Sequence, residues 1–136
     1  MSIPESARVF TFDSGGPDVW GPYGRWTVTL DVAGNLMLAH HLLGQTHAYG
    51  PTALDLPTRD ALWARVDALD LPNLPSSTRP PVPDEGAYTL RLESAAPPAA
   101  ARIWRADARR APRLAALVAA LTDVIAAATG VRPVLG

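Results

Sequence analysis

The chain of 136 residues contains no cysteine, and all twelve of its basic residues are arginine because lysine is absent as well. The lack of cysteine excludes a disulfide framework, a thiolate metal site and a cysteine nucleophile. Charged residues make up only 18% of the chain and the net charge is −1. A protein that binds nucleic acid mainly through charge carries a strong basic excess, so we expect no nucleic-acid partner.

Long hydrophobic runs are also missing. The longest, over residues 114–128, contains Asp123, and it falls short of the roughly twenty residues that cross a bilayer. The first residues show neither the basic nor the apolar region of a signal peptide. We therefore expect a soluble, cytoplasmic protein with no membrane partner.

With 48% apolar residues, the chain can fold as a single domain over residues 1–136.

Alternating polar and apolar side chains predict strands at residues 8–12 and 25–32, followed by apolar stretches at 36–43 and 46–49. Side chains alternate with a period of two, so the loop length after residue 32 decides which faces match. A two-residue loop would align Trp26 with the Met37 face. A three-residue loop gives the more apolar face with Leu36, Leu38 and His40, and we favour it because Asn35 tolerates the left-handed conformation. Residues 44–45 are expected to form the next tight turn.

Thr58 is expected to cap a helix that stops before Pro72. Five prolines in residues 72–84 indicate an extended connector, either a mobile flap or a rigid strap. Strands are expected at 87–93 and 101–105, and a last helix between Pro112 and Gly130. The predicted fold class is α+β: an antiparallel sheet of about six strands with two helices packed on one face, in the order β-β-β-β-α-β-β-α.

The loop of residues 14–24 is rich in glycine and proline and carries aromatic residues. Residues 13–17 reproduce the nucleophile motif of trypsin-like serine proteases, but such proteases need a much longer chain and upstream catalytic residues. Aromatic side chains on a shaped loop are common in binding surfaces. We therefore predict a non-catalytic binding module, with another protein as its partner. The predicted contacts in this loop are Ser14, Gly15, Gly16, Trp20 and Tyr23.

A dense group of arginines precedes the last helix. Cations near a helix N-terminus oppose the helix dipole, so helix stability does not explain their placement. One interpretation is a solvated rim; the other is a patch for an acidic partner or phosphate. The group consists of Arg102, Arg105, Arg109, Arg110 and Arg113, and we include the last four among the candidate binding residues.

Two histidines offer an alternative function. With a turn at residues 44–45, His40 and His47 would be diagonal neighbours on one face of a hairpin, within reach of a shared metal ion. A metal-binding protein or hydrolase centred on them would need further ligands, which no nearby motif supplies. The main prediction therefore includes no metal and no cofactor.

The last helix is apolar on one side and almost entirely alanine on the other. Such a helix is either enclosed by its own protein or covered by a partner. A homodimer formed through the alanine-rich face is therefore a further possibility.

The order of these elements resembles the emfourin family, small bacterial protein inhibitors of thermolysin-like metalloproteases with many uncharacterised relatives. The resemblance rests on a first strand that ends at residues 14–16, on the segments 71–75 and 83–92, and on a leucine-rich helix after Pro112. It spans most of the chain in order and spacing. It implies an inhibitor-like protein that docks through its N-terminal region.

Overall fold

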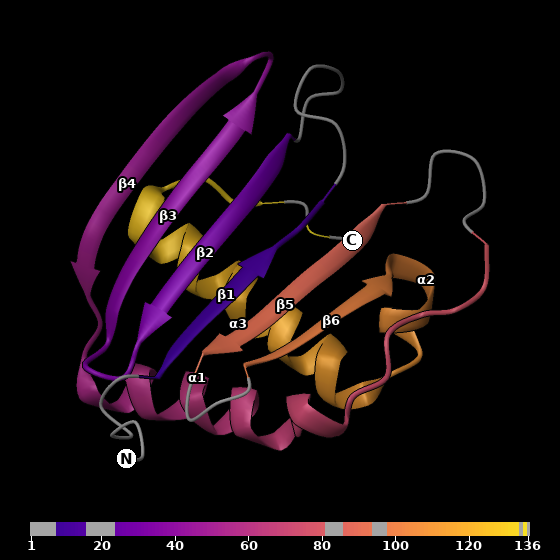
Figure 1. Ribbon diagram of the computed structural model, residues 1–136. Coiled ribbons are helices and arrows are strands. Elements are labelled where there is room, and N and C mark those ends of the chain that lie inside the picture. Colours follow the sequence, from indigo (N-terminus) through magenta and orange to yellow (C-terminus); the bar gives the residue numbers. More distant parts are fainter. Residues whose placement is uncertain (1–7, 16–23, 81–85, 94–97, 134, 136) are drawn as a thin grey trace.

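A computed structural model describes residues 8–15, 24–80, 86–93, 98–133 and 135. They form a six-stranded antiparallel sheet in the order β4-β3-β2-β1-β5-β6 (Figure 1). Its strands are β1 (Val9–Asp13), β2 (Arg25–Asp31), β3 (Asn35–Leu42), β4 (Gln45–Ala53), β5 (Ala87–Glu93) and β6 (Ala99–Trp104). This confirms the α+β class and the predicted order of strands and main helices.

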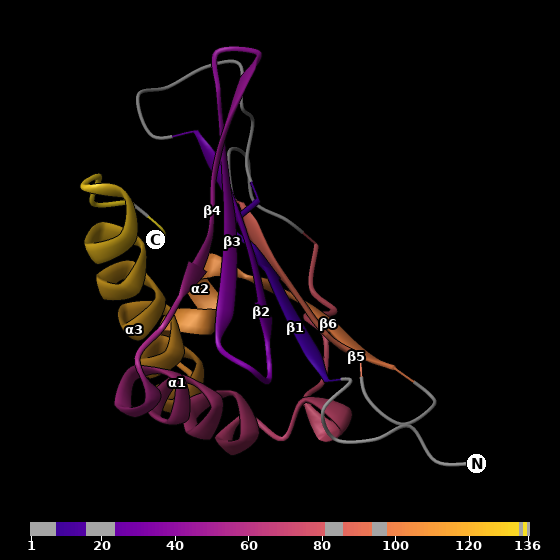
Figure 2. The same ribbon diagram turned by 90° about the vertical axis from the view of Figure 1, so that its left-hand side faces the viewer.

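The helices lie on one side of the sheet and leave the other side open (Figure 2). They are α1 (Leu56–Ala68), the short α2 (Arg105–Arg109) and α3 (Pro112–Thr129), and a 3-10 turn, η2 (Leu71–Asn73), follows α1. Helix α3 is the one described helix that is long and apolar enough to cross a membrane by length and composition. In this fold its four buried side chains, Leu114, Leu117, Leu121 and Ile125, belong to the hydrophobic core.

Strict alternation separates the two faces of the sheet. In β1 and β2 the helix-covered face carries fully buried apolar residues such as Phe12 and Trp26, whereas Asp13 and Arg25 point to the open face. Neighbouring strands keep this phase because the residues paired across an antiparallel ladder project to the same side. The open face of β1 and β2 carries mainly threonine and charged side chains.

The β2–β3 register agrees with the three-residue loop. Trp26 pairs with His40, Val28 with Leu38, and Leu30 with Leu36. The left-handed residue of the loop is Gly34, with φ +91°, rather than Asn35. Asn35 instead donates from its backbone and side-chain N–H groups to the carboxylate of Asp31. Partial burial raises the pKa of Asp31, but these and other turn hydrogen bonds outweigh it and leave the pKa below its usual value.

The expected turn at residues 44–45 is wrong by one position. The turn residues are Leu43 and Gly44, with φ values of +53° and +75°. A two-residue hairpin of this kind needs left-handed conformations at both positions, with glycine favoured at the second. The shift places His40 directly opposite His47 instead of diagonal to it.

The cap of α1 also differs from the expectation. Asp55, not Thr58, is the N-cap residue, and its Oδ1 accepts a hydrogen bond of 2.8 Å from the Thr58 backbone N–H. The helix thus begins at Leu56, ahead of Thr58, because Pro57 fits within the first turn, where its missing N–H has no partner to lose.

Replacing Asp55 with asparagine should flatten the acid dependence of stability. Hydrogen bonds from the side chain and backbone of Thr58 hold the pKa of Asp55 below its ordinary value. A lowered folded-state pKa contributes stability above the unfolded pKa, and this contribution is lost as pH falls through the folded pKa. Urea unfolding between about pH 5 and pH 2 should show a smaller loss in Asp55→Asn than in the wild type. Parallel pH profiles would contradict the assignment.

The described part of the proline-rich connector is a strap along β6. The backbone N–H of Ser77 donates to the Arg102 carbonyl at 2.9 Å, and the Ser77 hydroxyl accepts a hydrogen bond from the backbone N–H of Trp104 at 3.1 Å. The indole N–H of Trp104 donates to the Arg79 carbonyl at 3.0 Å. The strap therefore covers one edge of the sheet, as edge protection requires. Residues 81–85 of the predicted connector lie outside the described residues.

Candidate binding site

Ser14 anchors the start of the predicted binding loop. It is 1% exposed, its N–H donates to the Trp26 carbonyl at 2.9 Å, and its hydroxyl accepts the Trp26 N–H at 2.9 Å. Its carbonyl accepts a hydrogen bond from Arg105 Nη2 at 2.9 Å. Ser14 is thus a positioning residue rather than an exposed contact, and its hydroxyl is not presented as a nucleophile.

Gly15 is held against strand β5. It has a φ of +69°, and a Cβ atom at this position would overlap the carbonyl oxygen of Ala87. Its N–H donates to Asp13 Oδ1 at 2.8 Å. Only glycine fits this close approach of two backbones. The other predicted loop contacts, Gly16, Trp20 and Tyr23, lie outside the described residues.

Beside this anchor the open face is hollowed into a polar pocket of about 280 Å³. We call it the arginine pocket. The register of the strands brings the residues of this pocket together. Asp13 pairs with Thr89 across β1 and β5, and Thr89 pairs with Arg102 across β5 and β6. Its principal lining residues are Asp13, Gly15, Arg25, Thr89, Arg102 and Trp104.

The charges of the arginine pocket are incompletely matched. Arg25 Nε forms an ion pair with Asp13 Oδ1 at 3.9 Å, which is too far for a hydrogen bond. Among the described residues this buried nitrogen has no hydrogen-bond partner. Arg102 is exposed and stacks its guanidinium 5.0 Å from the centre of the Trp104 ring. No ion pair of Arg102 occurs within the part of the chain that the structure describes. The pocket can therefore bind an anion.

The arginine group of the sequence does not converge on one site. Arg105 donates from Nη2 to the Ser14 carbonyl, and its guanidinium lies 5.6 Å from the Tyr88 ring centre. Its Nε is buried and has no hydrogen-bond partner within the described ranges. Arg113 donates to the Ala68 carbonyl at 3.2 Å, at the negative end of the α1 dipole. Arg110 is exposed, and Arg109 lines a cavity on the helical side.

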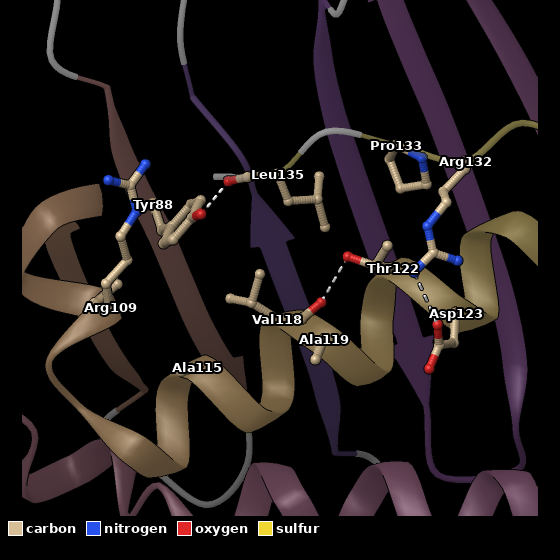
Figure 3. Close-up of a pocket in the computed structure, with 11 residues that line it drawn as sticks. Tyr88, Arg109, Ala115, Val118, Ala119, Thr122, Asp123, Arg132, Pro133 and Leu135 are labelled. Carbon is tan, nitrogen blue, oxygen red and sulfur yellow. Dashed lines mark hydrogen bonds and ion pairs between the residues drawn. The ribbon is translucent and has the colours of Figure 1, made fainter.

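This second cavity, of about 510 Å³, lies between α3 and the C-terminal residues (Figure 3). Its floor is mostly small and apolar, and Arg132 and Asp123 form an exposed ion pair of 3.5 Å at one side. The Tyr88 hydroxyl donates to the Leu135 carbonyl. Burial raises the pKa of Tyr88, more than the positive charges of Arg105 and Arg109 lower it.

Two of the three histidines make contacts with neighbouring side chains of the sheet. His40 is 8% exposed and its ring stacks on Trp26 at 4.0 Å with an interplanar angle of 7°. His47 lies opposite it and is exposed. His41 points to the open face and hydrogen-bonds Thr46 through Nδ1 at 2.9 Å. Among the described residues no group of three or more histidine, cysteine or acidic side chains could hold a metal ion.

Sequence reasoning placed a binding site beside residue 14 but did not include Arg25, Arg102 and Trp104 in it. The signal for Arg25 was present, since alternation in β2 puts it on the face opposite Trp26. Its proximity to Arg102 had no local signal, because it depends on the β1–β5 pairing. The chain matches no known protein-family model and no curated protein.

Proposed function

We propose that this protein is a non-catalytic binding module that docks on a partner protein with the loop of residues 14–24 and the end of the open sheet face from which that loop starts. The observation that carries the proposal is the fixed start of this loop, the loop root of residues 14–15. Ser14 forms two hydrogen bonds with the backbone of Trp26, through its own N–H and its hydroxyl, and Gly15 lies against β5. A binding segment with a fixed root loses less conformational entropy on association.

The surroundings of the anchor support docking rather than catalysis. The Ser14 hydroxyl is occupied by a backbone N–H, and His40 is committed to its stack on Trp26. Next to the anchor, the arginine pocket combines exposed charge with an aromatic side chain. Arginine and tryptophan are among the residue types most enriched in binding hot spots.

The partner class that the family resemblance implies is a thermolysin-like metalloprotease. A direct test is to measure hydrolysis of a peptide substrate by thermolysin at increasing ratios of this protein. Stoichiometric loss of protease activity would support inhibition by this class of contact. Unchanged activity at a large excess of the protein would remove thermolysin as a target while leaving other protein partners to a capture experiment.

Changing Trp20 and Tyr23 together to alanine should weaken capture of the partner at least tenfold, as the loss of two aromatic contacts predicts. The measurement is quantitative affinity capture from the lysate of the producing cell, followed by mass spectrometry. Leu56→Ala is the matched control, because Leu56 is 61% exposed at the start of α1, at the other end of the sheet (Figure 1). Equal capture by wild type and the double variant would overturn docking through this loop.

A further inference from the structure

We infer that the arginine pocket is a carboxylate-binding site that receives an acidic side chain of the partner. That the carboxylate comes from a partner protein rests on the proposed function. That the pocket recognises a carboxylate rests on the residues of the pocket alone. It names the group recognised by Arg25 and Arg102, two side chains that β2 and β6 bring to one hollow of the open face.

The first argument is the unpartnered nitrogen of Arg25. Its Nε is shielded from solvent and has no hydrogen-bond partner among the described residues, and buried donors in folded proteins are nearly always paired. Asp13, the nearest acid, already accepts the Gly15 N–H with its Oδ1 and stays 3.9 Å away. An oxygen supplied by a ligand would satisfy this donor.

The second argument is the charge of the pocket. Arg25 and Arg102 contribute two positive charges and Asp13 one negative charge, so the lining carries a net charge of about +1. A singly charged carboxylate balances this lining. A dianionic phosphate would leave excess negative charge beside Asp13, and like charges at short range in a partly shielded site repel strongly. A planar carboxylate also matches the fork of a guanidinium.

The third argument is the rigid wall beside Arg102. The backbone N–H of Trp104 donates to the Ser77 hydroxyl, and its indole N–H donates to the Arg79 carbonyl, which orients the ring. Arg102 stacks on its ring at 5.0 Å, which holds the guanidinium in place before a ligand arrives. The half-buried indole can also contact methylene groups. In a hollow of about 280 Å³ this combination fits a short chain ending in a carboxylate, as in a glutamate side chain.

The test is a titration of the 136-residue protein with N-acetyl-glutamate α-amide, whose single carboxylate mimics a glutamate side chain. The readout is the ¹H–¹⁵N signal of Arg25 Nε, which reports directly on the unpartnered donor. We expect a saturable shift with a millimolar Kd, typical of a small ligand with few contacts. Inorganic phosphate at the same ionic strength should bind at least fivefold more weakly.

Two variants distinguish binding of the carboxylate in the arginine pocket from nonspecific attraction of the carboxylate to surface arginines. Arg102→Gln should weaken the titration at least fivefold, with Arg25 Nε still available as the probe. The matched control is Arg91→Gln, because Arg91 lies on the same face and is paired with Glu93 outside the pocket. No saturable Arg25 shift, equal weakening by Arg91→Gln, or phosphate binding as tight as the carboxylate would each overturn the inference.

A second measurement distinguishes this inference from the proposed function. The double variant Arg25→Gln/Arg102→Gln should capture at least fivefold less partner protein than the wild type. If it captures as much partner while Trp20→Ala/Tyr23→Ala does not, docking through the loop stands and the carboxylate contact is overturned. If the titration succeeds but no partner depends on either double variant, the pocket chemistry stands and the docking function is overturned.

Discussion

Gly15→Ala should lower the free energy of unfolding by about 2–5 kcal/mol, which is a large share of the stability of a domain this size. Two costs combine. The left-handed conformation at φ +69° disfavours any residue with a Cβ, and that Cβ would overlap the backbone carbonyl of Ala87. Because the obstacle is backbone in the neighbouring strand β5, relief requires β1 and β5 to separate rather than a side chain to rotate.

Gly44→Ala provides the matched control for this prediction. Gly44 has a nearly identical φ of +75°, but no atom of the described residues lies within 4 Å of the point in the β3–β4 turn where the alanine methyl group would stand. Its substitution should therefore cost only the conformational term, about 1–2 kcal/mol. Urea unfolding at constant m-value measures both. Equal losses in the two variants would show that the contact with Ala87 contributes nothing and that the loop root is not held against β5.

Sequence alone predicted the sheet faces because the relevant signals are local. In β2 the alternation of apolar and polar residues fixes which side chains are buried, and the loop length before Asn35 fixes the partner face in β3. Both signals are contained within one hairpin. For Ser14, at the start of the glycine-rich segment, the same reasoning predicted an exposed contact, whereas the structure buries this residue against Trp26.

The turn and cap positions were missed because several local solutions compete within one or two residues. Gly44 can occupy either position of a two-residue turn, and the structure uses the second, with Leu43 strained at φ +53°. Asp55 and Thr58 are both good cap residues, and the choice between them depends on how far α1 extends toward the end of β4. In both cases a further local preference favours the observed solution: glycine at the second position of the turn, and Pro57 within the first turn of the helix.

The arginine pocket could not be predicted for a different reason. Arg25 and Arg102 belong to strands separated by β1 and β5 in the sheet order. No local sequence pattern predicts the pairing of β1 with β5. The arginine group also disperses because the chain changes period after Trp104, from the two-residue alternation of β6 to the helical turn of α2. Arg102 and Arg105 are three residues apart, so the alternation of β6 already directs them to different sides of the sheet.

Leu121→Ala should lower the free energy of unfolding by about 2–5 kcal/mol, the usual cost of a cavity left by a deleted leucine side chain. Leu121 is 0% exposed and packs within the core where α3 faces the sheet. The fold has only one layer of helix on that face (Figure 2), so little neighbouring structure can collapse into the space. Urea unfolding followed by circular dichroism measures the loss.

Ala127→Gln is the control for Leu121→Ala, because Ala127 is an exposed residue of the same helix. Its cost should be no more than about 0.5 kcal/mol, the difference in helix propensity between the two residues. The contrast tests whether α3 is stabilised by its leucine face alone. A loss in Ala127→Gln that approaches the loss in Leu121→Ala, and that depends on protein concentration, would mean that the alanine-rich face is buried in solution and that the folding unit is larger than one chain.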